Sequence, residues 1–206
     1  MPRNPSKLRL SELRRALLVS NVPAASSVPG QARAAAVAAV LREAPGGAEV
    51  LLIRRAEDER DPWSGHMALP GGHHDAGDAD LVATAVRETR EEVGLTLDRD
   101  TEWIGFLQRA RVHSGRRPDF EILPLVFAVQ REVELTPNPR EVKAVLWAKL
   151  DHLLLPAAQT SVAYPSLTAP EGQRLSAFDV QGHVVWGLTY RILSDLLAVW
   201  SPGTPG

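Results

Sequence analysis

The feature that most constrains this chain is a short glycine loop that leads into an amphipathic segment, within residues 69–95. Between residues 81 and 93 the side chains suited to a core recur at the helical period and share one side: Val82, Val86, Thr89 and Val93, with Ala85 at the edge. The other side carries three carboxylates, those of Glu88, Glu91 and Glu92. We therefore expect a helix that buries its apolar side and turns its glutamates away from the core.

Both ends of this predicted helix carry boundary signals. Asp78 or Asp80 can cap its start, and Gly94 suits the position just after its end. The preceding loop, Pro-Gly-Gly at residues 70–72, is tight enough for its backbone to approach a ligand or a metal ion closely. The segment thus places a loop built for close approach directly before a helix with defined ends.

The three glutamates predict a metal site. Spacings of three and four residues bring Glu88 close to both Glu91 and Glu92, and like charges there are destabilising without a counter-ion. Mg²⁺ or Mn²⁺, which accept oxygen ligands, would remove that repulsion. A solvated charged helix face is the alternative for such a run. The glycine loop and Arg87, which stands four residues before Glu91 and can orient it, favour the metal site.

The composition limits the size and the partners of the protein. With 206 residues, 44% of them hydrophobic, we expect one compact domain. The 23 basic and 25 acidic residues nearly balance, so there is no electrostatic footprint for nucleic acid and no basic face for a membrane. The chain has no cysteine, and residues 1–20 read as neither a signal peptide nor a membrane span. We therefore expect a cytoplasmic location.

The other elements follow from apolar runs and turn signals. Strand candidates lie at residues 34–41, 49–54, 102–108, 120–129 and 142–147. The first of these is alanine-rich and could equally be helical. The turn at residues 45–47 predicts a hairpin between the first two strands, and Pro124 predicts an edge position or a bulge in the fourth. Helix candidates outside residues 81–93 lie at residues 10–19, 151–154 and 189–200.

The remaining segments complete the predicted organisation. Residues 112–119 read as a polar loop. Residues 156–182, with three prolines and no clear period, read as a flap over the site, with a disordered segment as the alternative. We expect three parts: an N-terminal helix and connector at residues 1–33, the main domain at residues 34–200, and a flexible tail at residues 201–206. Strands with a central and a terminal helix predict an α/β fold.

The glycine loop and helix resemble the signature box of the Nudix hydrolases: Gly, five residues, Glu, seven residues, then Arg-Glu-apolar-x-Glu-Glu-x-Gly-apolar. The matching residues are Arg87, Glu88, Glu91, Glu92, Gly94 and Leu95. Counted from Gly72, Arg87 arrives one residue late, and Thr89 takes the apolar position. The first glutamate is absent, and Asp78 and Ala79 are nearest to its place.

The extra residue belongs in the loop. An insertion within the helix would rotate the carboxylates by about 100°, so we expect it between His73 and Asp78. The role of the missing glutamate stays unassigned, and Asp78 is expected to be only a cap or a loop residue.

The resemblance implies a Nudix-type α/β/α sandwich with a mixed sheet, and metal-dependent hydrolysis of a small-molecule diphosphate. It implies that Glu91 and Glu92 are the principal metal ligands, that Glu88 is a ligand or orients the attacking water, and that the Gly71 carbonyl joins them. Nudix hydrolases often add a carboxylate from a late loop. Glu141 is the candidate here, with Glu121 as the alternative, and a solvated loop charge is the other interpretation of Glu141.

Residues 51–72 are similar to an additional motif of the coenzyme A pyrophosphatase branch of that family. The matching residues are Leu51, Leu52, Arg55, Ala56, Arg60, Gly65, Pro70, Gly71 and Gly72. Ile53 and Leu69 depart from the motif, as does the spacing between Arg60 and Gly65. Residues 185–189, Val-Trp-Gly-Leu-Thr, also look like that branch.

This second resemblance implies hydrolysis of coenzyme A to 3′,5′-ADP and 4′-phosphopantetheine. Arg55 and Arg60, upstream of the loop formed by Gly71 and Gly72, are then expected to contact substrate phosphates, including the 3′-phosphate. Surface charge at a strand end is the alternative for each arginine. ADP-ribose or an oxidised nucleotide as substrate, and a Nudix-like binding module without catalysis, stay open.

Overall fold

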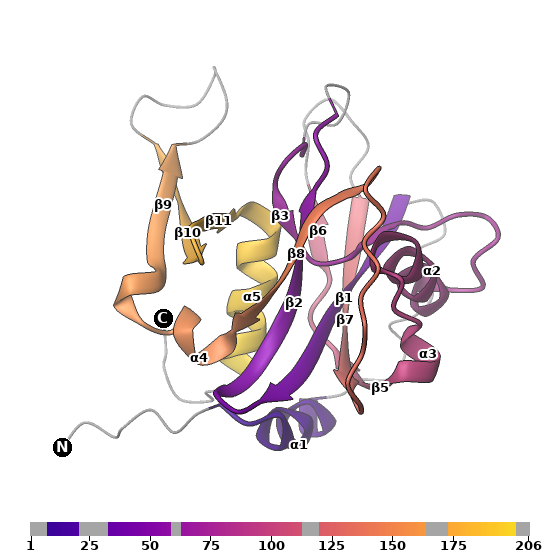
Figure 1. Cartoon of the computed structure of the whole chain (residues 1–206), viewed down its shortest axis with the longest axis horizontal. Helices are drawn as coiled ribbons and strands as arrows, with labels where there is room; N and C mark the ends of the chain where they lie inside the picture. The colour runs from indigo at the N-terminus through magenta and orange to yellow at the C-terminus, as the bar shows by residue number, and fades with distance from the viewer. Residues whose placement is uncertain (1–7, 21–32, 59–62, 113–119, 164–172, 201–206) are drawn as a thin grey trace.

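The computed structural model describes residues 8–20, 33–58, 63–112, 120–163 and 173–200. Its main sheet joins segments from most of the chain (Figure 1). The strands of this sheet are β1 (Arg33–Ala44), β2 (Gly47–Arg55), β3 (Met67–Ala68), β4 (Gly71–His73), β5 (Thr101–Phe106), β6 (Ala110–Val112), β7 (Phe120–Val129) and β8 (Val142–Lys149). The predicted strands are therefore confirmed, and the alanine-rich run forms a strand.

The pairing around β1 makes the sheet a mixed one. β1 and β2 form the predicted antiparallel hairpin, whereas β1 and β7 run parallel. β4 pairs with the start of β1, β3 and β8 pair with β2, and β5 and β6 pair with β7. β4, which contains the second and third residues of the Pro-Gly-Gly loop, therefore lies against a central strand.

Helices cover both faces of the sheet. They are α1 (Leu10–Ser20), α2 (Leu81–Val93), α3 (Leu97–Asp100), α4 (Leu150–Leu153) and α5 (Gly187–Trp200). In Figure 1, α2 and α3 lie on one side of the sheet and α5 on the other. Successive side chains of β2 point to opposite faces of the sheet. Leu51 packs with side chains of α2, and Leu52 packs with those of α1 and α5. The α/β/α sandwich is therefore confirmed.

Pro124 lies inside β7, which is paired on both sides. The edge position predicted as one alternative is therefore wrong. The Pro124 carbonyl accepts a hydrogen bond from the Leu107 N–H at 2.9 Å. The proline lacks an N–H, and this missing donor faces the same neighbouring strands as the carbonyl. There β5 pairs with β7 up to Leu125 and β6 pairs with it up to Ile122, so Pro124 lies in the gap between the two strands. The break between these two strands removes the need for a proline donor.

Residues 156–182 were expected to be a long flap, and the described part corrects this. It contains a short 3₁₀ turn (Pro156–Ala158) and strands β9 (Gln159–Ala163) and β10 (Arg174–Val180), which form a separate sheet with β11 (His183–Trp186). This sheet lies beside α5, on the side of the main sheet away from α2 (Figure 1). Every residue of β9 is exposed or half-buried, so its sequence lacks the alternation that signals a strand.

The predicted helices at residues 10–19, 151–154 and 189–200 are present, and the first is part of the core. Leu13 and Leu17 of α1 are fully or almost fully buried together with α5 side chains. Val112, the first residue of the loop predicted at 112–119, ends β6, and the rest of that loop, most of the connector and the tail at 201–206 lie outside the described residues. No described helix is long and apolar enough to cross a membrane.

Candidate active site

Local signals fix both ends of α2. Asp80 is the N-cap, and its side chain accepts a hydrogen bond from the Ala83 N–H at 2.9 Å. Gly94 ends the helix with φ of 73°, a left-handed conformation that favours glycine, and donates to the Arg90 carbonyl. Of the two aspartates that could cap the helix, Asp80 does so, and Asp78 is free for another contact.

The buried side of α2 differs from the predicted one. Its buried residues are Leu81, Thr84, Ala85, Thr89, Glu92 and Val93. Val82 and Val86, expected at the centre of this side, are only half-buried, and Glu92 is 3% exposed. The expectation that all three glutamates face away from the core is therefore wrong for Glu92. The apolar pattern misleads because the glycine loop supplies a hydrogen-bond partner for a carboxylate on the packed side.

That partner is the backbone of Gly71. Its N–H donates to Oε2 of Glu92 at 2.8 Å. Burial raises the pKa of Glu92 to about 8, against the lowering effect of this hydrogen bond, and the nearby charges of Glu88 and Glu141 raise it further. Near neutral pH the carboxyl group is therefore largely protonated unless a cation compensates its charge.

Glycine is required at position 71, next to the backbone of β1, and at position 72 it leaves room for the Glu88 side chain. A Cβ on Gly71, whose φ is 145°, would lie 2.3 Å from the Ala36 carbonyl oxygen. A Cβ on Gly72 would lie 2.4 Å from an oxygen of the Glu88 carboxylate. The absence of side chains lets the loop pack against β1 and lets Glu88 lie against the backbone.

Arg87 connects the loop before α2 to two of the glutamates. Its Nε and Nη2 donate to the two oxygens of Asp78, each at 2.9 Å. Its Nη1 lies 3.0 Å from Oε1 of Glu88 and 3.1 Å from Oε2 of Glu91. The contact with Glu91 is the one that the spacing predicts, whereas the contact with Asp78 was missed.

Asp78 is more than the cap or loop residue expected from the sequence. Its side chain is 6% exposed and also accepts hydrogen bonds from Thr84 Oγ1 and the Asp75 N–H. The Arg87 guanidinium holds the pKa of Asp78 well below its usual value. Asp78 is nine residues from Arg87, so helical spacing gives no signal of this pair. The signal available was a carboxylate near the place of the missing box glutamate.

Glu88 lies between the arginine and the other acids. Its side chain is 16% exposed. Burial raises its pKa, Arg87 lowers it, and the charges of Glu91 and Glu141 raise it. Four carboxyl groups thus share one electrostatic environment.

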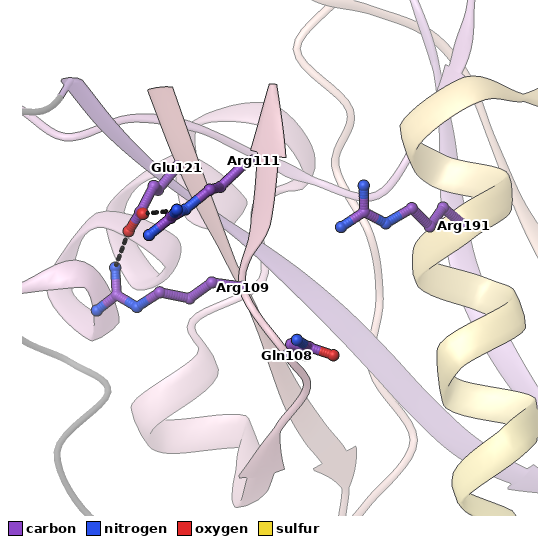
Figure 2. Close-up of a pocket in the computed structure, with 5 residues that line it drawn as sticks. All are labelled: Gln108, Arg109, Arg111, Glu121 and Arg191. Carbon is purple, nitrogen blue, oxygen red and sulfur yellow. Dashed lines mark hydrogen bonds and ion pairs between the residues drawn. The ribbon is translucent and has the colours of Figure 1, made fainter. Parts of the chain in front are cut away.

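Glu141 belongs to this environment because its loop is attached to α2. The Asn138 N–H donates to the Glu92 carbonyl at 2.9 Å, and Asn138 Nδ2 donates to Oε1 of Glu141 at 3.0 Å. Glu121, the alternative, instead forms ion pairs with Arg109 and Arg111 on another part of the sheet (Figure 2). The catalytic role of Glu141 stays a prediction, and its position near the helix glutamates supports it over Glu121.

Arg55 ends β2 close to the same acids. Its charge lowers the pKa of both Glu92 and His73. Arg60 lies outside the described residues, so its contact with a substrate phosphate stays a prediction.

The carboxylates suit a divalent cation but are not assembled as a cage. Among the described residues, no three His, Asp or Glu side chains converge in a metal-binding arrangement. Arg87 holds Glu88 and Glu91, and the Gly71 N–H holds Glu92. The donor set nevertheless fits a hard cation, because it offers only carboxylate oxygens whose mutual repulsion such an ion would relieve.

Known proteins are similar to this chain in sequence and in fold. The NUDIX domain family model matches residues 32–168. The chain is 33% identical over 174 residues to human mitochondrial coenzyme A diphosphatase NUDT8, which covers 82% of this chain and 70% of that protein. It is 38% identical over 123 residues to an uncharacterized protein of Schizosaccharomyces pombe, and this match covers 58% of this chain and 37% of that protein. The crystal structure of a NUDIX hydrolase from Alicyclobacillus acidocaldarius matches with a TM-score of 0.50 and 22% identity, over 62% of this chain and 83% of that one.

The fold, with a glutamate-bearing helix behind a glycine loop, and the match over most of the chain define the class: the chain belongs to the Nudix hydrolases. It is therefore an enzyme of a family that generally requires divalent metal ions. The resemblance found in the sequence is confirmed.

Proposed function

We propose that this protein hydrolyses the diphosphate bond of coenzyme A and its derivatives, releasing 3′,5′-ADP and 4′-phosphopantetheine or its acyl form. The observation that carries the hydrolytic part is the buried Glu92, held by the Gly71 N–H among the charges of Glu88, Glu141 and Arg55. The substrate rests on the motif at residues 51–72 and on the name of the human relative.

In this proposal Glu88, Glu91 and Glu92 hold Mg²⁺ or Mn²⁺, with the Gly71 carbonyl as a further ligand. The cation supplies charge neutralisation and a bound water of lowered pKa. Relatives with a catalytic name support this assignment over a binding module without catalysis. A cytoplasmic location is likewise part of the proposal, although the human relative is named as mitochondrial.

Several residues act on the groups that react. The Gly71 N–H keeps Glu92 in place, and Arg87, itself held by Asp78, keeps Glu88 and Glu91 in place. Arg55 offsets negative charge of the diphosphate. Its charge already acts on Glu92, so it lies close enough to the glutamates to do this. Glu141 orients or deprotonates the attacking water, a role that Glu88 can also fill.

The test is a product analysis with coenzyme A, ADP-ribose and an oxidised nucleoside triphosphate, each with Mg²⁺, with Mn²⁺ and with a chelator. We expect coenzyme A to be the preferred substrate, cleaved to 3′,5′-ADP and 4′-phosphopantetheine only when a cation is present. Preferential cleavage of ADP-ribose would replace the substrate while leaving the reaction class intact. No cleavage of any compound would support the binding module.

A further inference from the structure

A second group of charged side chains lines a pocket of about 560 Å³, which is within the size range of small-molecule sites. Figure 2 shows its lining residues, which come from the β5–β6 connection, β6, β7 and α5: Gln108, Arg109, Arg111, Glu121 and Arg191. The pocket lies at the part of the sheet where β6 pairs with the start of β7. None of its residues belongs to α2 or to the glycine loop.

Three arginines and one glutamate line the pocket, and two of the arginines contact the glutamate. Oε1 of Glu121 lies 2.8 Å from Nε of Arg111, and Oε2 lies 3.7 Å from Nη1 of Arg109. Glu121 thus orients Arg109 and Arg111, and arginine outnumbers glutamate among the lining residues. The Arg111 side chain is 71% exposed, so an incoming anion can reach its guanidinium.

The packing of α5 brings the third arginine to the pocket. Leu188 packs against a small cluster formed by Ala35, Ala110 and Ile122. Arg191 follows three residues later, on the same side of the helix, and is exposed. In Figure 2 its guanidinium extends from α5 toward the side of the pocket where the other arginines lie.

The pocket is close to the glycine loop. Glu121 pairs with Ala34 of β1, and the next residue of β1, Ala35, pairs with His73 of β4. The rings of His73 and Phe120 lie 5.8 Å apart between their centroids. Two strand spacings, roughly 10 Å, therefore separate the backbone of β7 from that of β4.

We propose that this pocket binds the 3′-phosphate of the substrate's ribose, while the glutamates and Arg55 act at the diphosphate. The inference rests on the proposed function, since only a nucleotide with a second phosphate needs such a subsite. Guanidinium groups suit phosphate because their planar forks donate paired hydrogen bonds and keep their charge. The 3′-phosphate, first expected at Arg55 and Arg60, is thereby assigned to Arg111 and Arg191, with Glu121 holding Arg111 in place.

Binding of products without metal tests the pocket independently of catalysis. The dissociation constants of 3′,5′-ADP, 2′,5′-ADP and 5′-AMP are measured by calorimetry on the parent, Arg191→Ala, Arg111→Ala and the double variant. Arg15→Ala is the matched control, because Arg15 is an exposed arginine on α1, which packs against the end of α5 far from Arg191. Arg191→Lys keeps the charge without the planar fork.

We expect the parent to bind 3′,5′-ADP ten- to a hundredfold more tightly than 5′-AMP, with 2′,5′-ADP weaker than 3′,5′-ADP. Each alanine variant should reduce that preference, the double variant should abolish it, and Arg191→Lys should keep part of it. Binding of 5′-AMP should change less than threefold in all of them, which also shows that they are folded.

Equal binding of 3′,5′-ADP and 5′-AMP by the parent, or a preference that survives in the double variant, would overturn the assignment. Equal binding of 2′,5′-ADP and 3′,5′-ADP would do the same, because it indicates general attraction of anions. These outcomes are separable from failure of the proposed function. A parent that cleaves coenzyme A and 3′-dephospho-coenzyme A equally well keeps the function and loses this subsite.

Discussion

Asp78 and Arg87 form a two-pronged ion pair, with both oxygens of the carboxylate 2.9 Å from nitrogens of the guanidinium. The same guanidinium contacts Glu88 and Glu91. Through this one arginine, the loop that precedes α2 sets the position of two glutamates proposed to bind metal. The pair therefore connects local stability to catalysis.

Asp78→Asn should destabilise the protein by about 2 kcal/mol, because a buried charged partner of Arg87 is lost. The sequence alone predicted only a cap or loop residue, whereas the observed contacts make Asp78 a buried partner of Arg87. Urea unfolding measures the change. Asp75→Asn is the matched control, since Asp75 is 75% exposed and lies 3.8 Å from Arg87, and it should change stability by less than about 0.5 kcal/mol.

The pH dependence of this pair has a defined sign. Arg87 lowers the pKa of Asp78 in the folded state, so the stabilisation is complete above the unfolded-state pKa of about 3.9 and is lost as the pH falls below it. The difference in stability between the parent and Asp78→Asn should therefore be constant from pH 5 to 7 and shrink in more acidic solution. A difference that grows with acidity would contradict the ion pair.

Glu92→Gln should stabilise the metal-free protein while it abolishes activity. Burial raises the pKa of Glu92 to about 8, so ionising this carboxyl group destabilises the folded state. This loss of stability is absent below the unfolded-state pKa of about 4.3 and grows as the pH rises to 8. The stability of the variant relative to that of the parent should rise by about 3 kcal/mol between pH 5 and pH 8. Added Mn²⁺ should stabilise only the parent.

The control for this experiment is Glu132→Gln, because Glu132 is an exposed glutamate after β7. Its stability should follow that of the parent at every pH. If Glu92→Gln were less stable than the parent at pH 8, Glu92 would be a structural acid whose charge the fold needs.

Glu141→Gln should lower kcat by about ten- to a thousandfold with little change in stability, since the side chain is exposed and its charge acts on Glu88 and Glu92. Glu134→Gln, another exposed glutamate before the same strand, is the matched control. The rate at saturating substrate and metal separates kcat from metal affinity. If Glu141→Gln and the control had equal rates, Glu141 would have no catalytic role, and Glu88 would be the residue that orients the attacking water.

The sequence predicts the parts of the site that depend on local spacing. Asp80 and Gly94 cap α2 through contacts within a few residues, and Arg87 reaches Glu91 one helical turn away. These signals persist in any tertiary setting, which is why the helix and its boundaries could be predicted. The same applies to the β1–β2 hairpin, whose turn residues lie between two apolar runs.

Contacts between distant segments could not be predicted in this way. Glu92 is buried because the Gly71 N–H, 21 residues earlier, meets it, whereas the apolar pattern of α2 placed it outside. The arginine pocket joins residues from β6, β7 and α5 that no spacing relates. Pro124 reads as a sign of an edge strand, yet it lies in an interior strand because its other partner strand is broken there.

The most direct test of the account is the rate of coenzyme A cleavage by Glu92→Gln beside the parent and Glu132→Gln, with saturating Mg²⁺ or Mn²⁺. We expect release of 3′,5′-ADP by the parent and the control, and a loss of about a thousandfold or more in kcat for Glu92→Gln, because the cation loses a charged ligand. Cleavage by Glu92→Gln within tenfold of the parent would contradict it.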